Sequence, residues 1–227
     1  MTSHPTELKP RKDEGLDREA KAMEAQVQQR LRETDRFHTE RLCQRYGDLV
    51  PAERIQRVKD LPTVFEDHGN FERSRLAAGA RPDKGTSVIG FSQGTAEAAH
   101  VNIDDFQSEK TAIHERLHQL SDPRAAELLG RRLNEGVTED LAIKELGRQP
   151  NPELPTCYAQ ERLGAQELRR MCGDGAVDNA YFRGDATDLR TCLDARLGHE
   201  NLDRLKDAAE APPPPDRDAQ DSEQQEG

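Results

Sequence analysis

The sequence contains few of the residues that build a large core or a membrane span. Tryptophan is absent, aromatic residues make up 4% of the chain and hydrophobic residues 33%, whereas 34% of the residues are charged. Because this hydrophobic share is well below the globular average, a substantial part of the 227 residues should lie outside a packed core. No apolar run approaches the length of a membrane span, and the polar amino terminus lacks the hydrophobic segment of a signal peptide. The sequence therefore predicts a protein that is made in the cytoplasm, does not insert into a membrane and, if exported, leaves without a cleaved signal.

Basic residues are fewer than acidic residues in this chain. The chain has 33 lysines and arginines against 44 aspartates and glutamates, which gives a formal net charge of −11. Nucleic acids and anionic membrane surfaces are bound through a positive face. The charge balance therefore argues against a nucleic-acid partner and against non-specific binding to a membrane surface.

Cysteine pairs with the spacing of a structural zinc site are missing. The four cysteines, Cys43, Cys157, Cys172 and Cys192, include no C-x-x-C pair, which argues against a thiolate-ligated zinc site. Without a signal peptide we expect reduced, partly buried thiols. Disulfides among the last three cysteines are the alternative if the protein works in an oxidising compartment.

The pattern of apolar residues predicts one compact domain with polar ends. Residues 1–15 are polar and proline-broken, and we expect them to be disordered. Residues 16–60 form an N-terminal helical arm, because apolar residues recur every three or four positions from Leu16 onward. This arm either packs across the main domain or extends as a coiled coil toward a partner or a delivery apparatus. Residues 61–200 form the main domain, and residues 201–227 continue a polar helix into a disordered, proline-rich acidic tail.

Short runs of β-branched and aromatic residues predict a small sheet before the middle of the chain. Residues 61–65, 86–92 and 98–103 are strand candidates, and Gln93-Gly94-Thr95 supplies a turn that joins the last two into a hairpin. Residues 66–86 contain glycines and a proline that indicate loops. Helical patterns fill the rest of the domain, at about 104–120, after Pro123, and at 133–146, 156–171, 175–182 and 185–197. The predicted fold class is therefore α+β, predominantly helical, with a small edge sheet beside the helix at 104–120.

That helix has a predicted start and a predicted buried face. Asp104 or Asp105 is the expected N-cap, since a side-chain oxygen at this position accepts from the free amide groups of the first turn. The expected buried stripe consists of Phe106, Ile113, Leu117 and Leu120.

The same helix carries the pattern His-Glu-x-x-His as His114, Glu115 and His118. Residues four apart share one helix face, so the two imidazoles can converge on a single metal ion. Glu115 lies about 100° round the helix, close enough to reach a water on that metal. Two neutral imidazoles on Zn²⁺ beside a carboxylate that takes a proton from water form the zincin arrangement. The motif therefore predicts one zinc site.

A catalytic zinc site normally has a third protein ligand. The three-histidine extension H-E-x-x-H-x-x-G-x-x-H is absent, because Ser121 and Arg124 stand where that pattern needs glycine and histidine. Glu135 is the better candidate, since it lies on the next long helical segment and can approach the metal from the opposite side. The predicted ligand set is therefore two histidines and one glutamate.

The histidine motif followed by Leu133-Asn134-Glu135-Gly136-Val137-Thr138-Glu139 resembles the gluzincin metallopeptidases. Its Glu-Gly-x-Thr-Glu pattern is similar to that of small bacterial metallopeptidase domains in polymorphic toxins and secretion-system effectors, over about residues 85–198. The resemblance implies a zincin-like domain with zinc-dependent endopeptidase activity. The two motif histidines and Glu135 would bind Zn²⁺, and Glu115 would act as general base and then as general acid. It also implies a protein or peptide substrate and, for a toxin, an immunity protein or a delivery partner.

Two features of the chain depart from this pattern. Arg116 occupies a position where many family members have an apolar or small residue, which predicts solvent or an acidic neighbour on that flank of the helix. Few aromatic residues are available to grip a substrate side chain. The alternative function is therefore that of a catalytically inactive zincin-fold binding protein.

Three further residues are candidates for supporting roles. Glu139 and Asp140 are carboxylates that can hydrogen-bond the ligating imidazoles and orient them, or can equally be solvated acids on a helix face. Tyr181 is the candidate catalytic residue that stabilises the oxyanion, ahead of Tyr158 and His199. A tyrosine in an Ala-Tyr-Phe run is also a typical packing residue.

Overall fold

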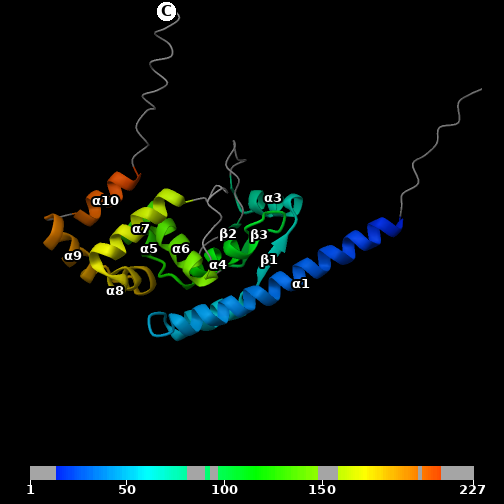
Figure 1. Cartoon of the computed structure of the whole chain (residues 1–227), viewed down its shortest axis with the longest axis horizontal. Coiled ribbons are helices and arrows are strands. Elements are labelled where there is room, and N and C mark those ends of the chain that lie inside the picture. The colour runs from blue at the N-terminus through cyan, green and yellow to red at the C-terminus, as the bar shows by residue number, and fades with distance from the viewer. Residues whose placement is uncertain (1–13, 81–89, 93–96, 148–157, 199–200, 211–227) are drawn as a thin grey trace, which may run out of the picture.

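The structure of the chain, a computed structural model, places a short sheet at one side of a helical body (Figure 1). A long helix at the amino-terminal end runs past this body and projects beyond it (Figure 1). The predictions for the amino terminus, the hairpin turn, His199 and the acidic tail lie outside the described residues. The structure describes residues 14–80, 90–92, 97–147, 158–198 and 201–210.

Helices account for most of the described residues, and the strands are short. The helices are α1 (Glu14–Arg45), α2 (Ala52–Asp60), α3 (His68–Ala77), α4 (Ser108–Leu120), α5 (Ala125–Leu129), α6 (Arg131–Leu146), α7 (Ala159–Cys172), α8 (Asp174–Asp178), the π-helical turn η1 (Asn179–Arg183), α9 (Thr187–Leu197) and α10 (Asn201–Glu210). The strands are β1 (Thr63–Glu66), β2 (Gly90–Ser92) and β3 (Ala99–Asn102). The predicted α+β, predominantly helical fold class is confirmed, and the zincin-like topology stays a prediction.

The sheet has the strand order β1-β3-β2, with β3 in the centre. Strand β1 runs parallel to β3 with Thr63 opposite Ala99, and β2 runs antiparallel to β3 with Phe91 opposite His100. The predicted pairing of the second and third strands is therefore confirmed. Within the described residues β2 has a strand neighbour on one side only, and it lies against α4. An edge strand therefore lies beside the helix that carries the histidine motif.

The main core lies where α4 meets α6. Leu117 of α4 is 0% exposed and Leu141 of α6 is 2% exposed, and both belong to the largest cluster of buried apolar residues. Helix α7 approaches the other side of α6 very closely at Gly136, where a Cβ atom would lie 2.1 Å from the carbonyl oxygen of Glu161. Only glycine allows this contact, and it fixes the part of α6 next to Glu135.

The two halves of α1 differ in burial. Leu42 and Tyr46, at and just after the end of the helix, belong to the main core. Met23 and Val27, in its first half, are 67% and 44% exposed. The later half of α1 therefore packs across the main domain, which is the first of the two arrangements predicted for this arm. A partner for the exposed first half stays a prediction.

Arg116 joins α1 to α4 in the interior. Its guanidinium pairs with Asp35 of α1 at 2.8 Å and donates to the carbonyl oxygens of Val58 and Leu61. The sequence predicted solvent or an acidic neighbour for Arg116, and the neighbour is acidic. Because both partners are buried, removing one of them would leave an unpaired charge and cost about 3–5 kcal/mol.

Helix α3 occupies residues 68–77, where the sequence predicted loops. Asp67 is its N-cap, and the carboxylate accepts from the backbone amide of Asn70 at 2.9 Å. The prediction was wrong because Phe71 is the one apolar side chain that the helix buries, so no apolar period marks it. The local signal for this helix was Asp67, because aspartate is a preferred N-cap residue.

Helix α4 begins at Ser108, later than predicted. Its N-cap is Gln107 rather than Asp104 or Asp105, and Asp105 instead accepts from the amide of Gln107 in the preceding turn. Phe106 consequently precedes the helix and is 63% exposed, so its place in the predicted buried stripe was wrong. The other three residues of that stripe are buried as predicted.

Two of the cysteines form a disulfide. Cys172 at the end of α7 is bonded to Cys192 of α9, because α7 packs against α9 and brings the two sulfur atoms together. Cys43 is a buried free thiol, and Cys157 lies outside the described residues. The expectation of reduced thiols was therefore wrong for one pair, and the alternative of a disulfide among the last three cysteines holds.

We expect reduction of the Cys172–Cys192 bond to lower the stability of the fold measurably. The bond closes a sequence separation of 20 residues, and a loop of that size loses about 3 kcal/mol of unfolded-state entropy. For a chain of this length that corresponds to about 6–12 °C in melting temperature. Thermal melts with and without a thiol reductant measure the effect. A Cys172→Ser/Cys192→Ser variant should melt at the lower temperature under both conditions; equal melting temperatures for wild type and variant without reductant would contradict the prediction.

Candidate metal centre

The three predicted ligand residues converge in the structure. His114 and His118 lie one turn apart on α4, and Glu135 faces them from α6. The Nε2 atoms of the two histidines are 3.1 Å apart, and each lies 3.2 Å from the same Oε2 atom of Glu135. These residues form a group of side chains within the described part of the chain that could hold a metal ion.

The spacing of these atoms fits a tetrahedral metal ion. Nitrogen and oxygen ligands lie about 2.0–2.1 Å from Zn²⁺, so two ligand atoms on one tetrahedral ion are about 3.3 Å apart. The observed triangle of two nitrogens and one oxygen is close to that size on every edge. Its side chains are 8%, 19% and 20% exposed, so the described residues leave the site partly accessible. The donor set and its geometry therefore suit a metal ion with three protein ligands.

The electrostatic surroundings of His114 favour a positive charge. Burial alone would lower the pKa of its imidazole, but hydrogen bonds with Glu135 and Glu139 raise that pKa to about 9. Burial would likewise raise the pKa of Glu135, yet its contacts with both histidines lower it well below the ordinary range. The carboxylates are thus held ionised around the point where the three ligand atoms meet, which favours binding of a cation.

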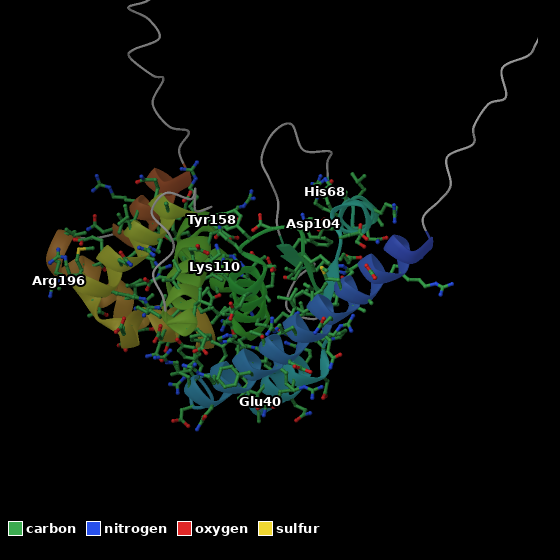
Figure 2. The ribbon with its side chains drawn as sticks, turned by 45° about the vertical axis from the view of Figure 1, so that its right-hand side comes forward. Glu40, His68, Asp104, Lys110, Tyr158 and Arg196 are labelled. Atoms are coloured by element: carbon green, nitrogen blue, oxygen red, sulfur yellow. A yellow bond between two sulfur atoms is a disulfide. The ribbon has the colours of Figure 1, made fainter. Side chains whose placement is uncertain are left out.

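Glu139 occupies the predicted orienting position, and Lys110 supports it. Glu139 is 0% exposed; its Oε2 lies 3.1 Å from Nδ1 of His114, and its Oε1 accepts from Nζ of Lys110 at 2.8 Å. Lys110, one turn before His114 on α4, is itself buried among the green helices (Figure 2). Burial would raise the pKa of Glu139, but the hydrogen bond with His114 and the Lys110 ammonium lower it. Lys110 therefore helps to keep the Glu139 carboxylate charged and turned toward His114.

We expect Lys110→Met to weaken zinc binding about 10–100-fold, the range typical for loss of a partner that orients a ligand. The reason is that the Glu139 carboxylate would lose its 2.8 Å contact and would no longer be held against Nδ1 of His114. Competition with a chromophoric chelator measures the zinc affinity. Lys144→Met is a matched control, because Lys144 pairs with Asp140 and has a half-exposed side chain. Equal losses in the two variants would count against the role of Lys110.

Glu115 lies directly under the edge strand. It is 6% exposed, and a Cβ atom added to Gly90 of β2 would lie 3.1 Å from its Oε1 atom and 2.3 Å from Thr111. The strand can pass this close to α4 only because residue 90 has no side chain. The carboxylate predicted to act as general base is therefore next to the strand to which an extended peptide could pair.

Tyr181 lies in the core, and its hydroxyl contacts a side chain of α6. It is 0% exposed, and its hydroxyl is 2.7 Å from Oγ1 of Thr138. Thr138 donates to the carbonyl oxygen of Asn134 within its own helix, so the tyrosine hydroxyl donates to Thr138. Burial raises the pKa of the Tyr181 phenol well above its ordinary value. These contacts match the packing role that the sequence allowed for Tyr181, and its catalytic role stays a prediction.

Tyr158, the next tyrosine candidate, contacts the site instead. Its ring stacks on the imidazole of His114 with the centroids 5.5 Å apart and the planes inclined by 12°. It precedes α7 in the left-handed backbone region, with a φ of 65°, and is 39% exposed (Figure 2). An L-residue is rarely found in this region, and such conformations cluster at functional sites.

Asp140 is not brought to the ligand atoms. Its carboxylate accepts from Gln166 at 3.0 Å and pairs with Arg169 at 3.2 Å and with Lys144 at 3.0 Å. It therefore links α6 to α7. Lys110 is the site residue that the sequence analysis missed; its position four residues before His114 was the available signal.

Comparison of the chain with protein families, with curated proteins and with solved structures found no match. None of the helices in the described residues combines the length and apolar character that a transmembrane span requires. The functional interpretation therefore depends on the residues of the site.

Proposed function

We propose that the chain is a zinc-dependent endopeptidase. The observation that carries this proposal is the triangle formed by the Nε2 atoms of His114 and His118 and the Oε2 atom of Glu135, with edges of 3.1–3.2 Å. Two imidazoles, one carboxylate and an open side are the ligand set of a catalytic zinc ion. A structural zinc site would instead be closed by four protein ligands.

In this mechanism the protein residues hold the metal and move one proton. His114, His118 and Glu135 would bind Zn²⁺, which supplies a Lewis acid and lowers the pKa of a water molecule to about 7. Glu115 would take a proton from the water that attacks the scissile carbonyl carbon, and would pass it to the amine as the C–N bond breaks. Glu139 keeps the His114 ring in the orientation, and in the tautomer, that leaves Nε2 as the acceptor.

Strand β2 is the proposed site for the substrate backbone. An extended peptide that pairs with an edge strand gains main-chain hydrogen bonds, whatever its side chains. Gly90 of β2 lies against Glu115, so a peptide paired there would pass the general base. The proposed substrate is therefore an extended segment of a protein or peptide.

Tyr158 is the proposed oxyanion donor, because its ring lies on the imidazole of His114 and the residue is partly exposed. Tyr158→Phe should lower kcat by about 10²–10³-fold with little change in KM, since the lost hydrogen bond forms mainly in the transition state. Steady-state kinetics with a quenched fluorescent peptide measures both constants. Tyr181→Phe is a comparison for stability rather than for kcat, and a larger kcat loss in Tyr181→Phe would reverse the assignment.

The resemblance of the motifs supports a setting as a bacterial effector or toxin. In that setting an immunity protein or a delivery partner would bind the chain, and the exposed first half of α1 is the segment that we assign to that contact. The Cys172–Cys192 disulfide supports action in an oxidising compartment.

The alternative, a catalytically inactive binding protein, is favoured by one observation. Glu115 is 6% exposed, so its carboxylate has little access to the water on which a general base must act. Purified protein from zinc-supplemented expression should contain about one zinc per chain under either hypothesis. Incubation with target-cell extract, followed by mass-spectrometric identification of new amino termini, separates the two. New termini produced by wild type but not by Glu115→Ala support the peptidase; their absence supports the binding protein, and less than half an equivalent of zinc contradicts both.

A further inference from the structure

The two faces of β2 present different surroundings to an added strand. Gly90 faces α4 and Glu115. The next residue, Phe91, faces the opposite side, where its ring meets Phe71 of α3 at 5.5 Å and stacks on His100 of β3 at 4.8 Å. A peptide paired with β2 would follow the same alternation, with successive side chains on opposite faces of the sheet. Every second side chain would therefore project away from the metal centre, toward α3.

A pocket of about 600 Å³ lies on that far face of the sheet. Helix α3, strand β3 and strand β2 contribute to its wall, so it is adjacent to the edge strand. Its lining is mainly apolar and comes from Leu61, Ala77, Ala78, Phe91 and Ala98, with Ser74, Glu97 and His100 as the polar members.

The polar residues around this pocket are tied to one another. Glu66 of β1 accepts from Ser74 Oγ at 2.7 Å with one oxygen and lies 2.8 Å from Nδ1 of His100 with the other. The amide of His68, at the start of α3, donates to Asp104 at 2.8 Å (Figure 2). These contacts fix α3 against the sheet at both ends. The pocket is therefore formed before any ligand arrives, which lowers the entropic cost of binding.

The chemistry of the wall selects against an acidic ligand. His100 has one ring nitrogen against Glu66 and one ring face against Phe91. Glu97 adds a carboxylate to the lining, and the chain as a whole carries a net charge of −11. A carboxylate side chain would lose its hydration here and meet charge of the same sign. Three alanines, a leucine and a phenylalanine ring suit a large apolar side chain instead.

We propose that this pocket is a specificity subsite that receives a large apolar side chain of the substrate peptide paired with β2. This inference rests on the proposed peptidase function. The substrate peptide must pass Glu115 on one face of the sheet, while the side chain of an adjacent peptide residue enters the pocket on the opposite face. The residue concerned lies within two positions of the scissile bond, because adjacent residues of a strand alternate between the two faces.

Cleavage-site profiling of a proteome-derived peptide mixture tests the subsite. Wild-type protein loaded with zinc should produce sites enriched in Leu, Phe or Met, and depleted in Asp and Glu, at one position within two residues of the scissile bond. Ala78→Phe, which fills the pocket from the end of α3, should reduce that enrichment about tenfold or more. Ala77→Phe fills the pocket from the neighbouring position, so it tests the subsite independently if the Ala78→Phe variant does not fold. Ala195→Phe, at an exposed position of α9, is the matched control and should leave the profile unchanged.

The outcomes separate this inference from the proposed function. Glu115-dependent cleavage with an apolar preference that Ala78→Phe and Ala77→Phe do not alter would overturn the subsite and leave the peptidase standing. Loss of the preference at that position, with the other positions unchanged, supports the subsite. Absence of any Glu115-dependent cleavage would overturn both. Circular dichroism melts of each variant show whether a changed profile reflects the pocket or the fold.

Discussion

Glu115→Gln is expected to lower peptide hydrolysis by about 10²–10⁴-fold, the share that a positioned general base contributes. Glutamine keeps the size of the side chain, so the contact below Gly90 remains and the fold should be undisturbed. It cannot accept a proton from water at neutral pH. Because Glu115 is not among the converging ligand atoms, the variant should still bind one zinc per chain.

The measurement is kcat/KM on a cleaved peptide, together with zinc content by elemental analysis. Glu127→Gln is a suitable control, since Glu127 is an exposed glutamate on α5 and should leave both quantities unchanged. If Glu115→Gln retained full activity with full zinc, another group would have to take the proton. If it lost zinc together with activity, Glu115 would be a ligand rather than a base.

Glu135→Ala is expected to abolish stable zinc binding and, with it, all zinc-dependent activity. The substitution removes one of three protein ligands and the only charged one, which leaves two neutral imidazoles. The loss of affinity should exceed the 10–100-fold that removal of an orienting partner causes. The helix should persist, because Glu135 is only partly buried and Gly136 keeps its contact with α7.

Chelator competition gives the zinc affinity, and thermal melts give an independent measurement. Zinc that binds the folded state raises the melting temperature of wild type, and this rise should disappear in Glu135→Ala. The Glu127→Ala variant should show the full rise. A Glu135→Ala protein that binds zinc with wild-type affinity would remove this residue from the ligand set and reopen the search for the third ligand.

Local sequence signals predicted most of the helices and the strand pairing. Gly147 ends α6 in the left-handed region with a φ of 70°, as a glycine after an apolar helical period indicates. The four-residue spacing of the two histidines predicted that they share one helix face, and this prediction needs no tertiary contact. Signals of this kind depend on neighbours within about one helical turn, so a single sequence is enough to reveal them.

The remaining features depend on how helices meet. Lys110 reaches Glu139 across the packing of α4 on α6, and no local pattern tells which buried lysine pairs with which acid. Tyr158 contacts His114 because its own φ is positive, a conformation that propensity assigns to glycine or asparagine. Tyr181 was the first candidate for the oxyanion donor, and in the structure its hydroxyl contacts Thr138. Contacts between distant segments therefore decide which of several tyrosines can serve the site.

The burial of α1 also determines where the chain can be shortened. Leu42 and Val58 are both 0% exposed, and Asp35 is the ionic partner of Arg116 on the helix that bears the histidines. A chain begun at residue 61 would lose all three and would leave the Arg116 guanidinium buried without its counter-ion. A chain begun near residue 30 would keep them and discard mainly exposed surface. The permissible cut therefore falls inside α1, not after α2.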